Sequence, residues 1–361
     1  MSTSPFMSPG QSRSRRESSR RRRRRRRAGA LATLATLATL AAIGLALALS
    51  SANTRHADAS SGARRARPAV IPAPALSPSG LPLGKPPLTL SGLKTPGADP
   101  LHLAFKAPPR AGLLFSLSTG QVLWERNPLL HLRIASLTKM MTALLAVGSP
   151  PDTPVLVTKQ AVEADGSKVG VLPLGRHVRL ESMLYGLLLP SGNDAAIAIA
   201  ERLAGSVDRF VAQMNAEAAK LGMGCTRYSS PSGYYDLGNF SCPADLAELA
   251  HVVLEQPRLA SIVRTYSAVL PFPIKGGKLY LYNNNPMLIY GYPGATGLKT
   301  GYTLAAGRCL VATAERDGVR LGVVLLHSPD PGTQARQLLD SGFEDVYHQR
   351  PVPEPPFPAG A

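Results

Sequence analysis

One strongly apolar segment that holds two polar residues limits what this chain can fold into more than any other feature. Residues 134–147 read IASLTKMMTALLAV, and their apolar side chains recur at the spacing of a helix that is buried on most sides. Ser136 and Lys139 are three residues apart, so both side chains lie on one helix face, one turn apart. A buried helix that places an amine beside a hydroxyl needs an explanation, because an unpaired buried charge is costly.

The S-x-x-K pattern is weak evidence when it stands alone. A lysine in an apolar helix usually lays its stem along the core and extends its amine into water. The chain also holds a second copy, Ser91-Gly-Leu-Lys94, in a stretch rich in Pro and Gly where no helix is expected. The interpretation of Ser136 and Lys139 therefore depends on the motifs that accompany them.

The positive charge of the chain is concentrated at its start. Fifteen arginines and only two acidic residues, Glu17 and Asp58, fall within residues 1–67, which leaves +4 of the +17 formal charge for the rest. A nearly balanced body argues against nucleic acid as a partner, although the pI of about 10.2 alone would suggest one.

An uncharged apolar run follows the arginines. Residues 1–27 form a basic arm, and residues 28–52 read AGALATLATLATLAAIGLALALSSA. A basic start followed by an apolar stretch predicts export, with the arm left in the cytoplasm and the rest of the chain outside. Two interpretations stay open for residues 28–52: a signal peptide cleaved after Ala52, or a retained membrane anchor, since about 20 apolar residues span a bilayer.

Low-complexity segments set the bounds of the globular part. Residues 53–100 are rich in Pro and Ala, which predicts a disordered linker, and residues 349–361 form a Pro-rich tail. A single folded domain over residues 101–348 is expected between them.

Periodicity within the domain predicts strands at both ends and helices in the middle. Strands are expected on either side of Ser118-Thr119-Gly120 within residues 113–125, and in a hairpin over 309–327 that turns at Asp317-Gly318. Helices are expected over 194–204, 207–221, 243–255 and 333–347, with Pro243 opening its helix after a capping-type Ser241-Cys242. The pattern predicts an α+β fold with one sheet built from both ends of the domain and an inserted helical lobe.

Two more short motifs follow the Ser136 segment, and their order and spacing are informative. Ser191-Gly-Asn193 comes 55 residues after Ser136, and Lys299-Thr-Gly301 comes 108 residues after Ser191. The order S-x-x-K, S-x-N and K-T-G is that of penicillin-binding proteins and β-lactamases. The surrounding strings PSGNDAA, LKTGYT and LGMGCTRYSSPSGYYD give the chain, over about residues 101–345, a resemblance to the low-molecular-mass penicillin-binding proteins of the D-alanyl-D-alanine carboxypeptidase family.

The resemblance implies a fold and an activity. The fold is β-lactamase/transpeptidase-like, with an antiparallel sheet flanked by helices and an inserted helical lobe. The activity is serine DD-carboxypeptidase action, which removes the terminal D-alanine from peptidoglycan stem peptides, needs no cofactor and is inhibited covalently by β-lactam antibiotics.

Chemistry explains why a serine stands beside a lysine. A serine hydroxyl is a weak nucleophile that needs an adjacent base, and an amine can serve only if it is kept neutral. We expect burial and the nearby positive charge of Lys299 to hold the Lys139 amine neutral. Ser136 is then the nucleophile and Lys139 its general base.

The resemblance assigns roles to the second motif and to the oxyanion hole. Ser191 would relay a proton to the leaving amine, and Asn193 would hold the peptide backbone of the substrate. The backbone N–H groups of Ser136 and Tyr302 would form the oxyanion hole.

The third motif is assigned to substrate binding in the same way. Lys299 and Thr300 would bind the terminal carboxylate of D-alanine. Gly301, without a side chain, would let an extended peptide lie against the strand edge.

The three cysteines of an exported chain allow at most one intramolecular pair. Cys225 and Cys242 flank a loop, and both a disulfide and two buried thiols remain open; Cys309 is expected in the core. Neither cysteines nor histidines have the spacing of metal ligands.

Three rival functions stay open to different degrees. A class A β-lactamase would need a glutamate followed four residues later by asparagine, which none of the glutamates between the second and third motifs has (Glu201, Glu217, Glu248 and Glu255). A DD-endopeptidase that cuts peptidoglycan cross-links would share all three motifs. A catalytically idle wall-binding protein is disfavoured by the intact Ser136 and Lys139.

Overall fold

The computed structural model describes residues 88–93, 100–234, 238–353 and 357. The predicted basic arm 1–27, the apolar segment 28–52 and most of the linker lie outside these residues. Within the described residues, no helix is both long and apolar enough to cross a membrane.

A five-stranded antiparallel sheet is the centre of the domain, and both ends of the domain contribute to it. The strand order is β2-β1-β11-β10-β9, which leaves β9 at one edge. The strands are β1 Ala111–Ser116, β2 Val122–Arg126, β9 Ala295–Thr303, β10 Gly307–Arg316 and β11 Val319–Ser328. The predicted α+β sheet is confirmed, including the hairpin turn at Asp317 and Gly318, whose positive φ angles of 47° and 78° suit a two-residue turn.

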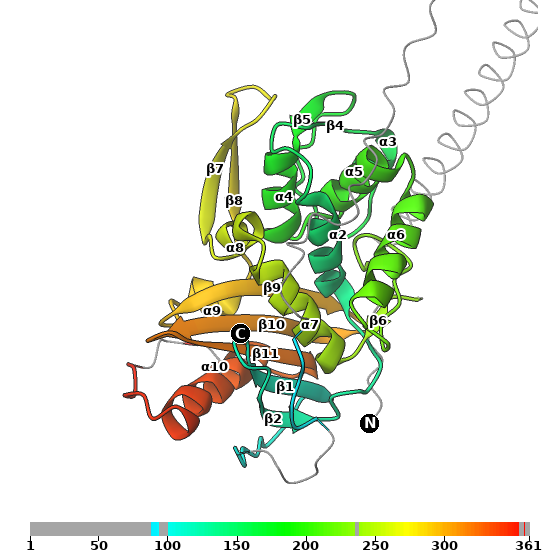
Figure 1. The fold of residues 1–361 in the computed structure, drawn as a ribbon. Coiled ribbons are helices and arrows are strands. Elements are labelled where there is room, and N and C mark those ends of the chain that lie inside the picture. The colour runs from blue at the N-terminus through cyan, green and yellow to red at the C-terminus, as the bar shows by residue number, and fades with distance from the viewer. Residues whose placement is uncertain (1–87, 94–99, 235–237, 354–356, 358–361) are drawn as a thin grey trace, which may run out of the picture. The chain divides into compact units, whose positions relative to one another are not determined.

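Helices cover both faces of this sheet. In Figure 1 a helical lobe stands on one side of the strands, and α10, Pro331–Ser341, lies on the other. The lobe and its surroundings comprise η1 Ala135–Thr138, α2 Lys139–Ala146, α3 Lys159–Val162, α4 Leu180–Leu188, α5 Asn193–Ala204, α6 Val207–Lys220, α7 Pro243–Leu254 and α8 Pro257–Val263. The short helix α9, Pro286–Ile289, instead packs through Met287 into the core that α10 shares. Three short antiparallel pairs join them: β3 Leu132–Arg133 with β6 Phe240–Ser241, β4 Pro154–Leu156 with β5 His177–Arg179, and β7 Ser267–Pro271 with β8 Lys278–Tyr282.

Apolar side chains on the two sheet faces form two separate cores. Val311 and Val324 belong to the large core shared with the helical lobe, whereas their neighbours Leu310 and Val323 pack on α10 through Leu338. Because successive strand residues point to opposite faces, β10 and β11 are buried on both sides and read as continuous apolar runs.

The predicted helices are confirmed with three local differences. The first segment is not helical from its start, because Ser136 lies in a single 3-10 turn and α2 begins at Lys139. The last one ends as a π-helical turn over Gly342–Val346. At α7, Pro243 occupies the first turn as expected, but Ser241 does not cap it, since its hydroxyl lies 2.7 Å from that of Thr226.

Residues 88–93, which the sequence placed in the linker, lie against the folded part. The Ser91 N–H donates to the carbonyl of Gly120 at 2.9 Å, and the carbonyl of Ser91 accepts from the Val122 N–H at 3.0 Å. Leu88, Leu90 and Leu93 pack against the large core. The fold therefore begins ahead of residue 101.

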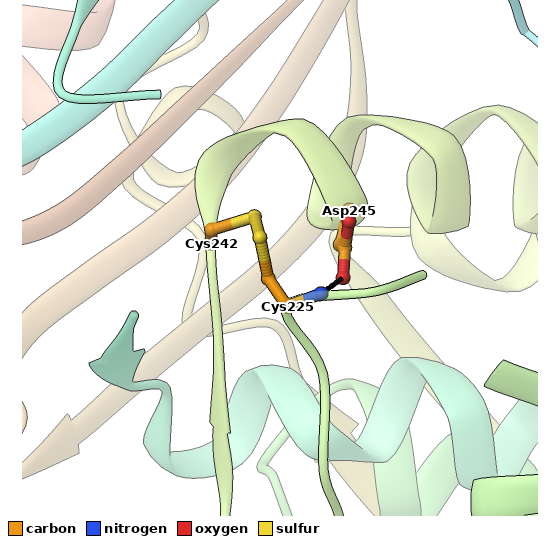
Figure 2. Close-up of side chains that lie close together, drawn as sticks. All are labelled: Cys225, Cys242 and Asp245. Atoms are coloured by element: carbon orange, nitrogen blue, oxygen red, sulfur yellow. Dashed lines mark hydrogen bonds between the residues drawn. A yellow bond between two sulfur atoms is a disulfide. The ribbon is translucent and has the colours of Figure 1, made fainter. Parts of the chain in front are cut away.

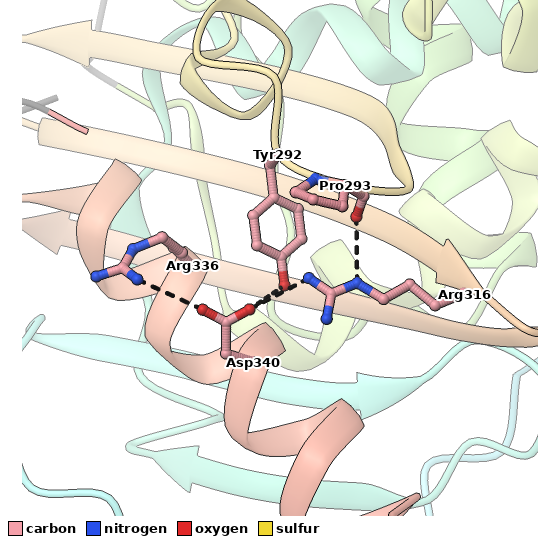
Figure 3. A network of polar contacts seen from close by, with 5 residues as sticks. All are labelled: Tyr292, Pro293, Arg316, Arg336 and Asp340. Atoms are coloured by element: carbon pink, nitrogen blue, oxygen red, sulfur yellow. Dashed lines mark hydrogen bonds and ion pairs between the residues drawn. The ribbon is translucent and has the colours of Figure 1, made fainter. Parts of the chain in front are cut away.

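A polar network ties α10 to the segment that enters the edge strand (Figure 3). The Asp340 carboxylate accepts from the hydroxyl of Tyr292 at 2.8 Å and pairs with Arg316 at 3.2 Å and Arg336 at 3.6 Å. The Arg316 Nε also donates to the carbonyl of Pro293 at 3.2 Å. Burial, with the nearby Asp340 charge, raises the pKa of Tyr292, so it stays a hydrogen-bond donor. The network fixes the start of β9 from the face opposite the helical lobe.

Cys225 and Cys242 form a disulfide, the first of the two possibilities left open by the sequence (Figure 2). Their Cα atoms are 5.7 Å apart, which is a normal separation for a disulfide. Asp245 in the first turn of α7 accepts from the N–H of Cys225 at 2.8 Å and from the hydroxyl of Thr226 at 2.6 Å. The disulfide and Asp245 together close the base of the loop between the two cysteines.

We predict that the Cys225→Ala/Cys242→Ala double variant lowers the free energy of unfolding by about 3 kcal/mol, because a loop of this length gains that much chain entropy when opened. Urea unfolding measures the change. Wild-type protein unfolded with a thiol reductant should show the same loss, and equal stability with and without the reductant would contradict the prediction.

Candidate active site

Ser136 lies in the 3-10 turn η1, at the junction of the sheet and the helical lobe. Ala135 before it has a positive φ of 48°, so the chain bends sharply just ahead of the serine. Gly301 of β9 packs against this turn: a Cβ at 301 would lie 2.9 Å from the carbonyl oxygen of Ile134 and 3.2 Å from the backbone nitrogen of Ser136. The edge strand can approach the serine this closely only because residue 301 has no side chain.

The Lys139 amine is fully buried and has three oxygen partners from three segments of the chain. Its Nζ lies 2.8 Å from Ser136 Oγ, 2.7 Å from Asn193 Oδ1 and 2.9 Å from the carbonyl oxygen of Ser232. The amide and carbonyl oxygens can only accept, whereas the hydroxyl can also donate. A neutral amine therefore donates its two N–H groups to Asn193 and Ser232 and directs its lone pair at the Ser136 hydroxyl.

Electrostatics favours this neutral form. Burial lowers the pKa of Lys139 well below its usual value, and the charge of Lys299 lowers it further, against an opposite effect of Asp194. Burial also lowers the pKa of Lys299, to about 7. Two buried amines in one electrostatic environment disfavour holding two charges, so the pair favours one neutral and one charged lysine.

The side chain of Asn193 is occupied at both ends. Besides accepting from Lys139, it donates through Nδ2 to the carbonyl of Asp165 at 2.5 Å. Asn193 is buried and does not line the cavity next to Ser136. These two bonds hold the Asn193 side chain beside the Lys139 amine, and its substrate-holding role stays a prediction.

The neighbouring Asp194 and Gly192 fix the wall beside this asparagine. The Asp194 carboxylate accepts from the N–H groups of Val169 at 2.9 Å and Gly170 at 3.1 Å. A Cβ at Gly192 would lie 2.6 Å from Asp194 Oδ1 and 2.9 Å from the carbonyl oxygen of Gly186. The middle residue of the S-G-N motif is therefore a glycine for packing reasons.

Ser191 lies in a strained and enclosed position on the wall of the cavity. Its φ is 68°, in the left-handed region that non-glycine residues rarely adopt. Its Oγ is buried and makes no hydrogen bond within the protein. A buried hydroxyl left open in this way suits a partner supplied by a bound substrate.

A cavity of about 380 Å³ brings the sequence-predicted residues together. Its walls include Ser136, Ser191, Thr300, Gly301 and Tyr302. Lys299 is buried behind this wall, where its amine donates to the carbonyl of Thr300 at 3.0 Å. Thr300 and Gly301, rather than Lys299, are thus the residues of the third motif that border the cavity.

The remaining cavity walls come from residues that carry no catalytic motif: Ser167, Asn284, Pro286, Ile289, Tyr290, Arg308, Cys309, Leu310 and Pro331. Cys309 is buried as expected, and its partner in the sheet is Gly301. Among the described residues, one group has the geometry of a metal site, Cys225, Cys242 and Asp245, and its two thiols are used by the disulfide.

Sequence reasoning missed the loop that supplies the third partner of Lys139. Gly233, with a positive φ of 76°, lies so close to the turn of Ser136 that a Cβ would overlap the carbonyl of Ala135. Ser230 Oγ accepts from the Gly233 N–H at 3.0 Å and from Asn239 Nδ2 at 2.9 Å, which fixes the loop. The string SSPSG is the sequence feature that could have indicated this loop. A backbone carbonyl that accepts from an amine, however, requires no particular residue type, so the sequence does not reveal it.

We predict that Gly301→Ala lowers the rate of Ser136 acylation by penicillin on the order of a hundredfold, because the added methyl displaces the turn that carries the nucleophile. The matched control is Gly148→Ala, where a Cβ would meet no atom within 4 Å. Stopped-flow acylation kinetics compare the variants; equal rates for Gly301→Ala and wild type would contradict the packing argument.

Comparison with known proteins shows the family of this chain. A family model described as D-alanyl-D-alanine carboxypeptidase matches residues 106–330. A D-alanyl-D-alanine carboxypeptidase of Bacillus subtilis is 32% identical over 268 residues, covering 72% of this chain and 67% of the relative. One of Mycobacterium tuberculosis is 36% identical over 245 residues, covering 65% of this chain and 82% of the relative.

Solved structures agree as well. A crystal structure of a D-alanyl-D-alanine carboxypeptidase from Mycobacterium tuberculosis superposes with a TM-score of 0.62 at 34% identity, covering 67% of this chain and 93% of the other. A D-alanyl-D-alanine endopeptidase of Pseudomonas aeruginosa is also similar, 33% identical over 259 residues, covering 65% of this chain and 82% of that protein. The chain belongs to the D-alanyl-D-alanine carboxypeptidase family of serine peptidases.

Proposed function

We propose that this penicillin-binding serine DD-carboxypeptidase removes the terminal D-alanine of peptidoglycan stem peptides through an acyl-enzyme on Ser136. One observation carries the assignment of the nucleophile. The Lys139 amine is buried, its pKa is lowered, and its Nζ lies 2.8 Å from Ser136 Oγ.

Acylation follows from these contacts. Ser136 Oγ attacks the carbonyl carbon of the D-Ala-D-Ala peptide bond while its proton moves to Lys139 Nζ. The negative charge that forms on the carbonyl oxygen is stabilised by the backbone N–H groups of Ser136 and Tyr302. The close packing of Gly301 on the Ser136 nitrogen supports this pairing, because Tyr302 is the next residue along the strand.

Departure of D-alanine needs a proton on its amine. Ser191 borders the same cavity as Ser136, and its buried hydroxyl has no partner in the protein, which supports the role of a relay from Lys139 to the leaving amine. Asn193 is proposed as the residue that keeps the amine of Lys139 in place.

Recognition of the free C-terminus is assigned to the third motif. The Thr300 side of the strand borders the cavity, and Lys299 supplies a positive charge from behind it. A bound carboxylate raises the pKa of a neighbouring amine, so Lys299, with a pKa of about 7 in the empty site, becomes charged when substrate is present.

The rate at which a penicillin adduct is hydrolysed is what would distinguish this enzyme from a β-lactamase. No Asp or Glu is among the described residues that line the cavity. Three of the four glutamates considered above are engaged elsewhere: Glu201 with Thr158, Glu217 with Lys220 and Glu255 with Arg320. A long-lived acyl-enzyme is therefore expected.

DD-endopeptidase action on cross-links is the second candidate function. It is favoured by the similarity to the Pseudomonas aeruginosa endopeptidase. Release of D-alanine from a monomeric pentapeptide, compared with cleavage of a cross-linked peptide dimer, measures which reaction dominates.

The substrate also places the enzyme outside the cytoplasm, since peptidoglycan lies there. We assign export to residues 28–52, with the basic arm 1–27 left in the cytoplasm. N-terminal sequencing of the exported protein distinguishes cleavage after Ala52 from a retained anchor.

We predict that Ser136→Ala abolishes both D-alanine release and covalent labelling by penicillin, because it removes the cavity hydroxyl that lies 2.8 Å from the Lys139 amine. Mass spectrometry of the intact protein measures labelling, and circular dichroism checks that the fold is kept. A stable penicillin adduct on the variant would contradict the assignment of the nucleophile.

Lys139 and Lys299 should respond differently to substitution. Lys139→Arg should remove acylation, because a guanidinium stays charged and cannot act as a base. Lys299→Arg should keep part of the activity, because it keeps the positive charge. Lys299→Gln should weaken substrate binding and raise the pKa of Lys139, since one of the charges that lowers it is gone.

The pH dependence of kcat/KM tests these roles. Activity should rise with pH as Lys139 loses its proton and should fall as Lys299, with a pKa of about 7, loses its charge. In Lys299→Gln the falling limb should disappear and the rising limb should move to higher pH. An unchanged rising limb in Lys139→Arg would show that Lys139 is only structural.

A further inference from the structure

The hairpin of β7 and β8 exposes aromatic side chains on one face. Its inner face is apolar and buried, with Leu279 and Leu281 each 4% exposed. Its outer face carries Val269, Tyr280 and Tyr282, which are 56%, 60% and 60% exposed. Figure 1 shows the hairpin standing beside α4 and pointing away from the sheet. Large exposed side chains gathered on one face are typical of a binding surface.

The exposed row of β8 leads into the catalytic cavity. Residues two apart in an extended chain lie on one face, and exposed side chains alternate through Lys278, Tyr280, Tyr282 and Asn284. Asn284 lines the cavity that contains Ser136. Its N–H donates to the carbonyl of Leu189 at 3.2 Å, and its Nδ2 donates to that of Pro190, the residue before Ser191, at 3.3 Å. The row is thus continuous with the wall of the active site.

The aromatic rings of Tyr266, Tyr280 and Tyr282 lie near one another on the exposed side of the hairpin. In the hairpin register, Tyr282 lies opposite Ser267 and Tyr280 opposite Val269. Tyr266 packs against Tyr282, with ring centroids 6.4 Å apart and an interplanar angle of 66°. Side chains two residues apart on a strand are separated by about 7 Å. We name Tyr266, Val269, Tyr280 and Tyr282 the tyrosine face.

The chemistry of this face suits a polysaccharide. Tyrosine offers a flat apolar ring for the C–H face of a sugar and a hydroxyl for its polar groups, and its stiff side chain loses little entropy on binding. The substrate of the proposed reaction is a peptide attached to a glycan strand. A stem peptide bound at Ser136 therefore tethers its sugar chain a few residues away, and each residue of an extended peptide spans about 3.5 Å.

The hairpin is less suited to a membrane surface. Insertion into lipid needs apolar side chains at the most exposed point. The turn between the strands instead contains Lys275, Gly276 and Gly277, while Phe272 is buried and Ile274 packs on the core.

We propose that the tyrosine face is a subsite for the glycan strand of peptidoglycan, leading from the hairpin through Asn284 to Ser136. This inference rests on the proposed function, because the glycan is recognised as part of the carboxypeptidase substrate. The subsite lies outside the residues that bind or cleave D-Ala-D-Ala, so it should distinguish polymeric from small substrates.

The test compares two substrates in one double variant, Tyr280→Ala/Tyr282→Ala. With glycan-linked pentapeptide chains, kcat/KM should fall about tenfold, the usual effect of losing aromatic anchors at a binding surface. With a free acylated tripeptide ending in D-Ala-D-Ala, kcat/KM and penicillin labelling should stay unchanged. Leu174→Ala, at an apolar site of equal exposure (60%) on another part of the domain, is the control and should change neither.

Direct binding gives a second readout. A peptide-free tetramer of N-acetylglucosamine, titrated by NMR against the Ser136→Ala protein, should perturb the hairpin signals, and the double variant should lose this response. Three results would each overturn the subsite. In the double variant, kcat/KM could fall equally on both substrates, or it could stay unchanged on the glycan-linked substrate. The double variant could also lose binding to anionic lipid vesicles and keep the response to the sugar. Absence of D-alanine release by wild type from both substrates would instead refute the proposed function.

Discussion

The contact between a buried amine and a serine hydroxyl is the interaction on which the rest of this site depends. Water would compete for the Lys139 lone pair and restore its proton, so the chain must bury the amine and still satisfy its N–H groups. The three partners come from η1, from the first residue of α5 and from the loop before β6. Elements distant in sequence must meet at one nitrogen atom, and the helical lobe must therefore be folded before the base exists.

Glycines make this convergence possible. Gly301 lets the edge strand reach the Ser136 turn, Gly233 lets the loop carrying Ser232 reach the same turn from another side, and Gly192 lets α5 begin close to Gly186. At each position an added Cβ would meet backbone or side-chain atoms inside 3 Å. In two of the motifs, S-G-N and K-T-G, the glycine thus serves packing of the protein on itself, a reason that adds to the open strand edge expected for Gly301.

The sequence predicted the elements with strong local signals and missed those without them. The Asp317-Gly318 hairpin, α5, α6 and α7 carry turn residues or clear amphipathic periods, and all four were found. The helix α4, LESMLYGLL, is buried on nearly every side, and Arg179 ahead of it provides no side-chain cap, so no local signal marks its start. The hairpin of β7 and β8 alternates in burial, yet its Pro residues and its glycine turn concealed it.

The site shows the same division. Motifs in the sequence mark Ser136, Ser191 and the K-T-G strand, so these residues could be predicted, and they line one cavity. The hydrogen-bond partners of each atom could not be predicted in this way. Asn193 is one case, since only coordinates reveal that both ends of its amide are used within the protein. Ser232 is another, since it acts through a carbonyl that every residue possesses.

The disulfide connects these local facts to the fold as a whole. Cys225 and Cys242 close the loop that contains Ser230, Ser232 and Gly233, and Asp245 fastens the base of that loop to α7. Over its described residues, 226–234 and 238–241, the loop makes few regular backbone contacts of its own. Its position at Lys139 relies on side-chain bonds such as Asn239 to Ser230 and on this covalent closure. A backbone carbonyl can keep a catalytic amine in place only if its loop cannot move away. The crosslink removes unfolded and partly opened arrangements of that loop, and so it favours the conformation in which the lone pair of Lys139 faces Ser136.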